Sequence, residues 1–372
     1  MLWEMFQKGN IRVYKTEKKQ VVKFLEALYY PVISVAVAVI ISGIMMRCLG
    51  FDPIKAYKYL FQGAFGSVAS FSESIVKAIP LVFMGLSFAM AMRSGMINLG
   101  ATGQLYIGAL FGTFVATNFG SLPLIIHLPL TLIAGFAGGA LMGWIVSILK
   151  SKFGASELIT TIMLNNIAIQ LISYMVTGPM KDTAVSNFPQ SARVLPTAEL
   201  PKLISGTRLH AGLFIAILAI VFYYVFLWWT RRGYEVRVVG ANKYAGIYAG
   251  MNVRKNQMIA MMIAGGMAGL GGCIEIISVQ TRLMQAFAGN TGFDGIAVAL
   301  LGNNTPVGIG LSALLFGVLN NGSGTMEMLA KVPNALVYMV QGLIVLFVVG
   351  RNMFRFEGLR RRFGKKKHVK EV

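Results

Sequence analysis

The chain of 372 residues is far more apolar than a soluble protein of this size. Hydrophobic residues make up 56% of it and charged residues only 13%. The mean hydropathy is +0.66, so the composition predicts an integral membrane protein. The net charge of +20 would allow nucleic-acid binding, but the basic residues flank apolar runs or lie in the C-terminal tail. This placement favours a role in membrane topology and contact with anionic lipid over nucleic acid.

Apolar runs that can cross about 30 Å of hydrocarbon as helices recur along the chain. They lie at 29–49, 74–92, 104–118, 125–148, 158–176, 211–229, 258–278 and 333–350. A glycine-broken stretch at 293–321, interrupted at Gly302–Pro306, predicts two short helices that are either re-entrant or thin spans. The sequence therefore predicts an all-α, polytopic membrane protein with about ten transmembrane helices.

Lysine and arginine positions predict the orientation, because cytoplasmic segments retain excess positive charge. An inside N-terminus places 24 of the 34 basic residues in cytoplasmic segments. These segments are 1–28, 93–103, 149–157, 230–257 and 351–372. We therefore predict a basic cytoplasmic N-terminal segment at 1–28, a transmembrane domain at 29–350 and a basic cytoplasmic tail at 351–372. The segment 177–210 becomes an extracellular loop, and both termini are cytoplasmic.

Several kinds of chemistry have no matching motif in the sequence. A phosphate loop for ATP is absent, and the cysteines and histidines do not cluster as metal ligands would. The apolar runs hold no series of charged residues of the kind that a proton relay needs. Asp294, just before GIAVALLG, is predicted to be a structural helix cap, with a substrate or ion role as the alternative. No catalytic residue and no metal site are predicted.

Polar amides interrupt two of the apolar segments. In GMINLGATGQLYIGAL, at 95–110, Asn98 and Gln104 are either hydrogen-bonded clips that hold a turn or polar lining of a translocation path. The predicted span 158–176 raises the same choice, since interhelical hydrogen bonds are the alternative to pathway lining. Its polar residues on one flank are Thr160, Thr161, Asn165 and Asn166.

The loop at 230–257 contains a short segment with unusually small side chains. Asn242 is suited to cap a helix over NKYAGIYAG. One side of that helix would be nearly bare because of Ala245, Gly246, Ala249 and Gly250. Such a helix can sit closely in the groove of a cytoplasmic partner. The alternative is a positively charged connecting loop with no docking role.

Four ordered stretches resemble one protein family. TRRGYEVRVVGANKYAGIYAGMNV, from Thr230, and GFDGIAVALLGNNTPVGI, at 292–309, resemble the inner-membrane permease subunits of ABC importers for simple sugars and nucleosides, in the ribose-permease superfamily. GMINLGATGQLYIGAL and GASELITTIMLNNIA, at 154–168, are similar to two further signatures and point to the nucleoside branch. The sequence departs from the family at Thr102, where an acidic residue is usual.

The resemblance implies a transport subunit that is not itself an enzyme and binds no cofactor. ATP and magnesium would be bound by a separate ABC ATPase, and the loop at 230–257 would carry the coupling helix. A second permease subunit, a paralogue that forms a heterodimer, and an extracellular substrate-binding protein would complete an importer of the cytoplasmic (inner) membrane. The alternatives are the same role for a simple sugar, or a stand-alone ion-coupled secondary transporter.

Glycine-rich breaks also predict an internal symmetry. The Gly95–Gly103 turn follows the second predicted span, and GNTGFDG follows the seventh, on the opposite side of the membrane. Spans 2–5 and 7–10 thus read as two copies in inverted topology, an arrangement found in transporters with alternating access.

Overall fold

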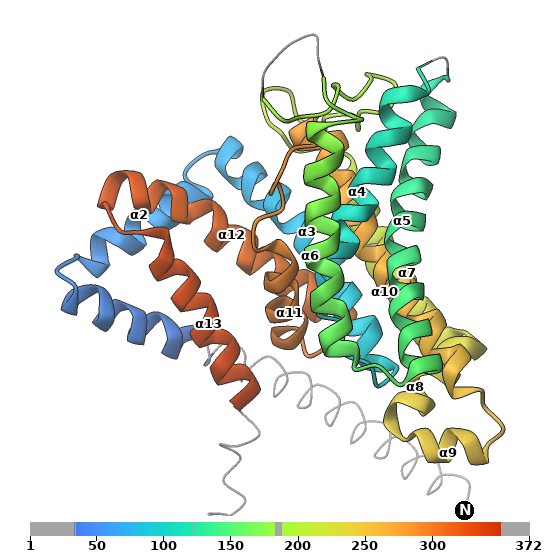
Figure 1. The fold of residues 1–372 in the computed structure, drawn as a ribbon. Coiled ribbons are helices and arrows are strands. Elements are labelled where there is room, and N and C mark those ends of the chain that lie inside the picture. Colours follow the sequence, from blue (N-terminus) through green and yellow to red (C-terminus); the bar gives the residue numbers. More distant parts are fainter. Residues whose placement is uncertain (1–32, 34, 121, 183–187, 351–372) are drawn as a thin grey trace, which may run out of the picture. The chain divides into compact units, whose positions relative to one another are not determined.

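The computed structural model describes residues 33, 35–120, 122–182 and 188–350, so the predicted segments 1–28 and 351–372 lie outside the described residues (Figure 1). The described residues form helices and no strand. Three isolated antiparallel bridges join residues of the segment between α6 and α7 to each other or to Met284. The all-α prediction is confirmed for this part of the chain.

The chain divides into two compact units. The first comprises residues up to Pro53 and from Ala335 onward, and its described part holds the apolar helix Val35–Cys48 and most of α13 (Asn334–Gly350). The second unit, Ile54–Asn334, holds the other helices and every site discussed below.

The second unit begins with helix α2 (Pro53–Phe65), which the sequence did not predict, and continues through ten further α-helices. These are α3 (Val68–Arg93), α4 (Ala101–Asn118), α5 (Leu124–Phe153), α6 (Glu157–Thr177), α7 (Gly212–Trp229), α8 (Arg231–Ala241), α9 (Lys243–Tyr248), α10 (Val253–Glu275), α11 (Thr291–Leu301) and α12 (Pro306–Ala330). A five-residue π-helix, Ile276–Gln280, extends α10.

Six described helices are long and apolar enough to cross a membrane. They are α3, α5, α6, α7, α10 with its π-helical extension, and α12. Each predicted span overlaps a helix, but only six helices of the described residues meet the length and apolarity of a crossing, so the predicted count of about ten is not confirmed. The expectation of two short helices in 293–321 is wrong for α12, which has 25 residues. Its polar stretch stays helical because Asn321 donates hydrogen bonds to the carbonyls of Gly63 and Ser70.

Close backbone contact between glycines holds the centre of the second unit together. A Cβ built on Gly139 of α5 would overlap the carbonyl oxygen of Gly265 on α10, and a Cβ on Gly265 would overlap that of Gly139. Small residues let membrane helices approach until dispersion contacts are dense, which replaces the hydrophobic driving force that lipid does not supply. Together with α3 and α4, these helices form the most tightly packed part of the unit.

The second unit has two distinct ends. Helices α8 and α9 lie at one end, called the α9 end, and the long segment between α6 and α7 lies at the other, called the loop end (Figure 1). The turn between α3 and α4 is at the α9 end, because a Cβ on Gly240 of α8 would overlap the carbonyl oxygen of Arg93 at the end of α3.

Candidate functional site

The turn between α3 and α4 is closed by a fully buried pair of amides. Asn98 donates to Gln104 Oε1 at 2.8 Å and to Ser87 Oγ at 3.0 Å. Its own Oδ1 accepts from Gln104 Nε2 at 3.2 Å and from the Gly100 amide at 3.0 Å. The two side chains are at most 1% exposed. Their geometry is that of a clip, and a role in lining the path stays a prediction.

Helix α6 is fastened to the same turn. Asn165 Oδ1 accepts from the Gly103 amide at 2.7 Å, and its Nδ2 donates to the Leu99 carbonyl at 2.8 Å. Thr161, also buried, donates to the Glu157 carbonyl within α6 and packs beside Gly100. The structure therefore brings together Asn98, Gln104, Thr161 and Asn165, in the packed interface between α6 and the turn.

The opposite face of α6 carries a row of polar side chains that, among the described residues, no other helix of the second unit covers. The packed face consists of Thr161, Asn165, Ala168, Ile172 and Val176, all buried. With 3.6 residues per turn, a second set lies on the other side of the helix. We call it the α6 polar stripe: Asn166, Gln170, Ser173 and Thr177. Three of the four side chains are exposed and Ser173 is half-buried.

The α6 polar stripe is unusual for a helix of membrane length. A helix face that meets lipid is expected to be apolar, because hydrocarbon cannot satisfy an amide. Met163 and Tyr174, exposed by 62% and 63%, flank the stripe, and Gln285 reaches in to donate to Ser173 Oγ at 2.8 Å. The sequence analysis singled out Asn166 but missed the rest. The spacing of polar residues at 166, 170, 173 and 177 was the available signal.

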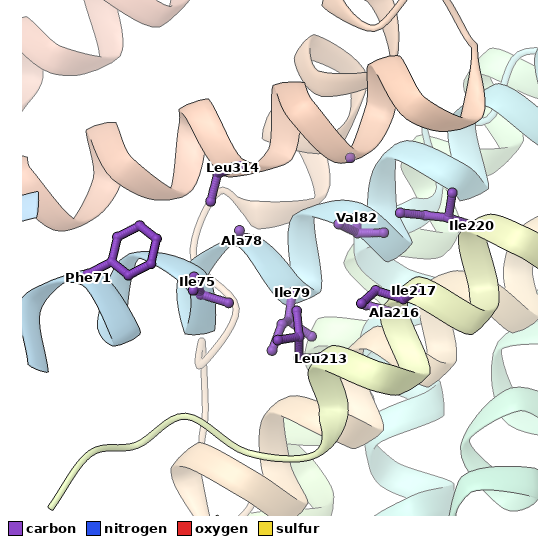
Figure 2. A pocket seen from close by; sticks show the side chains of 11 residues that line it. Phe71, Ile75, Ala78, Ile79, Val82, Leu213, Ala216, Ile217, Ile220 and Leu314 are labelled. Atoms are coloured by element: carbon purple, nitrogen blue, oxygen red, sulfur yellow. The ribbon is translucent and has the colours of Figure 1, made fainter. Parts of the chain in front are cut away.

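An apolar groove lies on another side of the unit, between α3, α7 and α12 (Figure 2). Its volume is about 290 Å³, and its lining is entirely apolar. Phe71, Ile75 and Ile79 of α3 line it together with Leu213 and Ile217 of α7, and Ile79 lies beside Leu213. Without a hydrogen-bonding group, this groove has no means of orienting a hydroxyl-rich solute.

Helix α9 has the predicted cap, but one of its four small residues does not face outward as predicted. Asn242 Oδ1 accepts from the amides of Tyr244 and Ala245, so the cap forms as expected. Gly246, however, is buried, and a Cβ there would lie 3.1 Å from Val239 Cγ2 of α8. Gly246 therefore packs on the chain's own α8, which corrects the expectation that it faces outward, while Ala245, Ala249 and Gly250 stay exposed.

The outward face of α9 is formed by large side chains instead. Tyr244, Ile247 and Tyr248 are 70%, 59% and 96% exposed, and we call them the α9 knob. Ala245, Ala249 and Gly250 are also exposed but contribute little surface. Exposed apolar side chains gathered on a short helix mark a surface that a partner covers.

Helix α8, which carries α9, is anchored to α10 by a carboxylate. Glu235 accepts from Asn256 Nδ2 at 3.1 Å and pairs with Arg232 and Arg231 at 3.1 and 3.3 Å. The hydrogen bond from Asn256, followed by the two arginines, holds the pKa of Glu235 below its usual range. Glu235 is therefore ionised at neutral pH and fixes the direction of α8.

Charged groups also gather at the loop end. Arg208 makes a two-pronged ion pair with Glu73 of α3, at 2.6 and 3.1 Å, and Lys77 donates to the Asn320 carbonyl at 3.0 Å. Asp294 is hydrogen-bonded to the Asn320 side chain. It lies inside the first turn of α11, where Asn290 occupies the cap position, so the prediction that Asp294 caps the helix is wrong.

Histidine and cysteine hold structural positions. His127 of α5 bonds to Thr197 Oγ1 at 2.8 Å and to the Val115 carbonyl at 3.1 Å. Cys273 is buried in α10 and Cys48 is exposed in the first unit. Within the ranges that the structure describes, no group of three histidine, cysteine or acidic side chains is placed to bind a metal ion.

These features define a polytopic α-helical membrane protein with a polar, uncovered helix face and a protruding helix at one end. Residues 70–349 match the family model described as "Branched-chain amino acid transport system / permease component". The chain belongs to this family of permease components, so it is a transport subunit rather than an enzyme.

Three characterised relatives are similar over nearly their whole length. A glucose ABC transporter permease of Haloferax volcanii is 38% identical over 335 residues, 87% of this chain and 88% of the relative. A guanosine ABC transporter permease of Bacillus subtilis is 38% identical over 339 residues, 90% of this chain and 97% of the relative. A nucleoside ABC transporter permease of Lactococcus lactis is 35% identical over 326 residues, 86% and 89% of the two chains.

Bacillus subtilis also has a second guanosine ABC transporter permease, which is 26% identical to this chain over 295 residues, 76% of this chain and 90% of the relative. One organism thus holds two guanosine permeases that differ in their similarity to this chain.

Proposed function

We propose that the chain is one of two permease subunits of an ATP-driven importer and forms half of a translocation path for nucleosides. The α6 polar stripe is the observation that carries this proposal beyond the family. Amides and hydroxyls are the groups that a neutral, hydroxyl-rich solute can exchange for water on its way through the membrane. Because the stripe has no charge and few partners, it would bind such a solute weakly and release it.

The choice of nucleoside over sugar rests on the relatives and on one aromatic residue. Three of the four relatives named above are nucleoside or guanosine permeases, while the fourth is a glucose permease. Tyr174 stands beside the α6 polar stripe and is 63% exposed. A flat aromatic ring can stack on a nucleobase, which a sugar lacks. A simple sugar remains the second candidate cargo, supported by the Haloferax relative.

Partner chains follow from the two uncovered surfaces. A second permease, a paralogue of this chain like the second Bacillus guanosine permease, would cover the α6 polar stripe and complete the path. A separate ATPase, which binds ATP and magnesium, would receive the α9 knob, while a substrate-binding protein would dock at the loop end. This assignment puts the α9 end in the cytoplasm and the protein in the cytoplasmic membrane. The basic residues of the two terminal segments are the separate reason to propose that both termini are cytoplasmic.

The charged groups at the loop end fit an ATP-driven permease better than an ion-coupled transporter. Arg208 pairs with Glu73, and Lys77 donates to the Asn320 carbonyl. An ion-coupled carrier needs a charge that changes partners as cargo moves. Compensated groups at one end of a bundle fit a structural role better.

Uptake by cells that lack their own nucleoside importers tests the cargo. Cells producing the complete complex should accumulate labelled guanosine, and excess unlabelled nucleoside should compete while glucose and branched-chain amino acids do not. Gln170→Leu should lower uptake while normal amounts of complex form, since Gln170 is exposed. Met163→Leu, on the same face, is the matched control and should transport normally. Competition by glucose alone would instead assign the sugar as cargo.

Docking of α9 is tested separately. Tyr248→Asp adds a charge to a side chain that is 96% exposed, so the subunit should still insert but should no longer retain the ATPase during purification. Arg231→Ala, on the neighbouring α8 and also well exposed, is the control and should retain it. Normal ATPase retention by Tyr248→Asp would remove the α9 knob from the interface.

Orientation is tested with impermeant thiol reagents in a variant in which Cys48 is replaced by alanine. Ser205→Cys, exposed at the loop end, should react in intact cells. Tyr248→Cys should react only after lysis. The reverse pattern would invert the proposed topology.

A further inference from the structure

Four side chains and one backbone carbonyl, from four elements, meet at the α9 end in what we call the Trp228 cluster. Its members are Trp228 and Tyr223 of α7, Arg93 of α3, Arg237 of α8, and Asn304 of the turn between α11 and α12. The sequence analysis named only the Gly302–Pro306 break, which contains Asn304. No other contact described above links α8 to the turn between α11 and α12.

Trp228 links α3 to α8. The guanidinium carbons of Arg93 and Arg237 both lie 5.5 Å from the centre of its ring, within the distance at which a cation and an aromatic face attract each other. Tyr224 stacks on Trp228 at 5.5 Å and fixes the ring from within α7. Two cations that share one ring move together with it, because each would lose an attraction if the ring turned.

Arg93 also contacts the turn at Gly302–Thr305. Its Nη2 donates to the Asn304 carbonyl at 3.0 Å, and the Tyr223 hydroxyl donates to the same oxygen at 3.0 Å. Asn303 and Asn304 both have a φ of 53°, a left-handed conformation that costs free energy for a residue with a side chain. The two donors from α3 and α7 therefore help to hold a strained turn in place.

The Trp228 cluster also has unused hydrogen-bonding groups. Arg93 Nε, Arg237 Nε and Asn304 Oδ1 are buried and have no hydrogen-bond partner among the described residues. Unpaired buried polar atoms are rare in folded proteins because each one costs free energy. Two spare donors and one spare acceptor in a single cluster provide the groups for a second pairing, once the elements shift.

We propose that the Trp228 cluster carries movement of the α8–α9 segment to the turn between α11 and α12, with Arg93 as the positioning residue that joins them. The inference rests on the proposed function, since it assigns the origin of the movement to an ATPase bound at α9. When α8 shifts, Arg237 moves with it and displaces Trp228, and Arg93 follows the ring and pulls on Asn304. The strained turn then relaxes, and α12 changes its position.

The decisive quantity is cargo taken up per ATP hydrolysed, measured on the complete complex in proteoliposomes. Arg93→Met removes the cation and the donor but keeps a long apolar side chain. It should leave ATP hydrolysis stimulated by loaded binding protein within about twofold of the parent and lower uptake per ATP about tenfold. Arg93→Lys, which keeps a cation and a donor, should recover most of the coupling. Arg254→Met, exposed at the start of α10 and outside the cluster, is the control and should behave as the parent.

A double variant tests whether the cluster acts as a unit. If Arg93 and Arg237 act through one ring, Arg93→Met with Arg237→Met should couple no worse than the poorer single variant. Multiplied losses would show two independent sites and overturn the proposal, as would parental uptake per ATP in Arg93→Met. If Arg93→Met fails to assemble, uptake per ATP is measured in Arg237→Met alone, because Arg237 lies outside the candidate spans. Parental uptake per ATP in Arg237→Met would also overturn the proposal.

A second readout does not require knowledge of the cargo. Val307, 64% exposed in the first turn of α12, can be replaced by cysteine in the Cys48→Ala background. Its rate of thiol labelling should change when ATP is added to the parental complex and should stay constant in the Arg93→Met complex. If the parental complex takes up neither guanosine nor glucose, the proposed cargo fails. If the labelling rate still changes with ATP in the Arg93→Met complex, the Trp228 cluster does not carry the movement to α12.

Discussion

Two turns at the α9 end use asparagine in opposite ways. In the turn between α3 and α4, a glycine, Gly95, takes the left-handed conformation with a φ of 76°, and both ends of the Asn98 amide are hydrogen-bonded. In the turn between α11 and α12, asparagines themselves are left-handed and Asn304 Oδ1 is buried without a partner in the described part of the chain. The first turn is built to stay closed, and the second retains strain and spare groups that allow movement.

Breaking the closed turn should have the largest effect on stability. Asn98→Ala removes four hydrogen bonds and leaves both ends of the buried Gln104 amide without that partner, at a cost of about 3 kcal/mol. We expect the apparent midpoint of thermal unfolding in detergent to fall by roughly 5 °C or more. Asn166→Ala, on the exposed face of α6, should leave the midpoint unchanged. Equal midpoints for Asn98→Ala and the parent would remove the contrast between the turns.

Removing one of the two hydrogen-bond donors to the turn between α11 and α12 should lower stability less than Asn98→Ala does. Tyr223→Phe deletes the hydroxyl that donates to the Asn304 carbonyl but leaves the Arg93 bond in place. The expected loss is about 1 kcal/mol, seen as a smaller drop in the same unfolding midpoint. A drop as large as that of Asn98→Ala would mean that the second turn is as rigid as the first.

Relieving the strain itself should change stability least. Asn304→Gly suits a positive φ and deletes the unpaired Oδ1, but it also makes the unfolded chain more flexible. These opposing effects should keep the free energy of unfolding within about 1 kcal/mol of the parent. The carbonyl that accepts from Arg93 and Tyr223 remains. Strong destabilisation would show that the Asn304 side chain has a partner in the assembled complex.

Acid pH should affect α8 and the turn between α3 and α4 differently, without any substitution. The pKa of Glu235 is below its usual value of 4.5 in the folded protein, so its contribution to stability is present above pH 4.5 and is lost as the pH falls through the lower, folded value. Hydrogen exchange, corrected for the intrinsic rate, should therefore rise in α8 at acid pH. The amides at 98–104 should keep their protection because Asn98 and Gln104 do not titrate. Equal loss of protection in both regions would point to global unfolding.

The helices of the second unit follow closely from hydrophobicity and breaker residues. The predicted runs at 125–148 and 158–176 lie inside α5 and α6, because lipid demands long apolar helices whatever their neighbours are. The length of the apolar run gave a wrong prediction at α12, because the helix continues through the polar segment that begins at Asn320. Its amides find partners on α2 and α3 that no local pattern reveals.

Side-chain direction was less predictable than helix position. The cap by Asn242 depends on residues within one stretch of four and is confirmed, whereas the orientation of Gly246 depends on how α9 folds back on Val239. Asp294 was read as a cap because it precedes an apolar run, but α11 begins a turn earlier, at Thr291. The partners of Lys77 and Glu73 are Asn320 and Arg208, which lie more than a hundred residues away in the sequence and could not be predicted from it.

The α9 knob also bears on how cells handle the subunit before assembly. Tyr248 is almost fully exposed on a segment outside the candidate spans, so a newly made chain presents tyrosine and isoleucine side chains to water until something covers them. Chaperones and proteases recognise such surfaces. We expect chains made in excess of their partner to be degraded, so that the amount of this subunit follows the supply of the protein that binds α9.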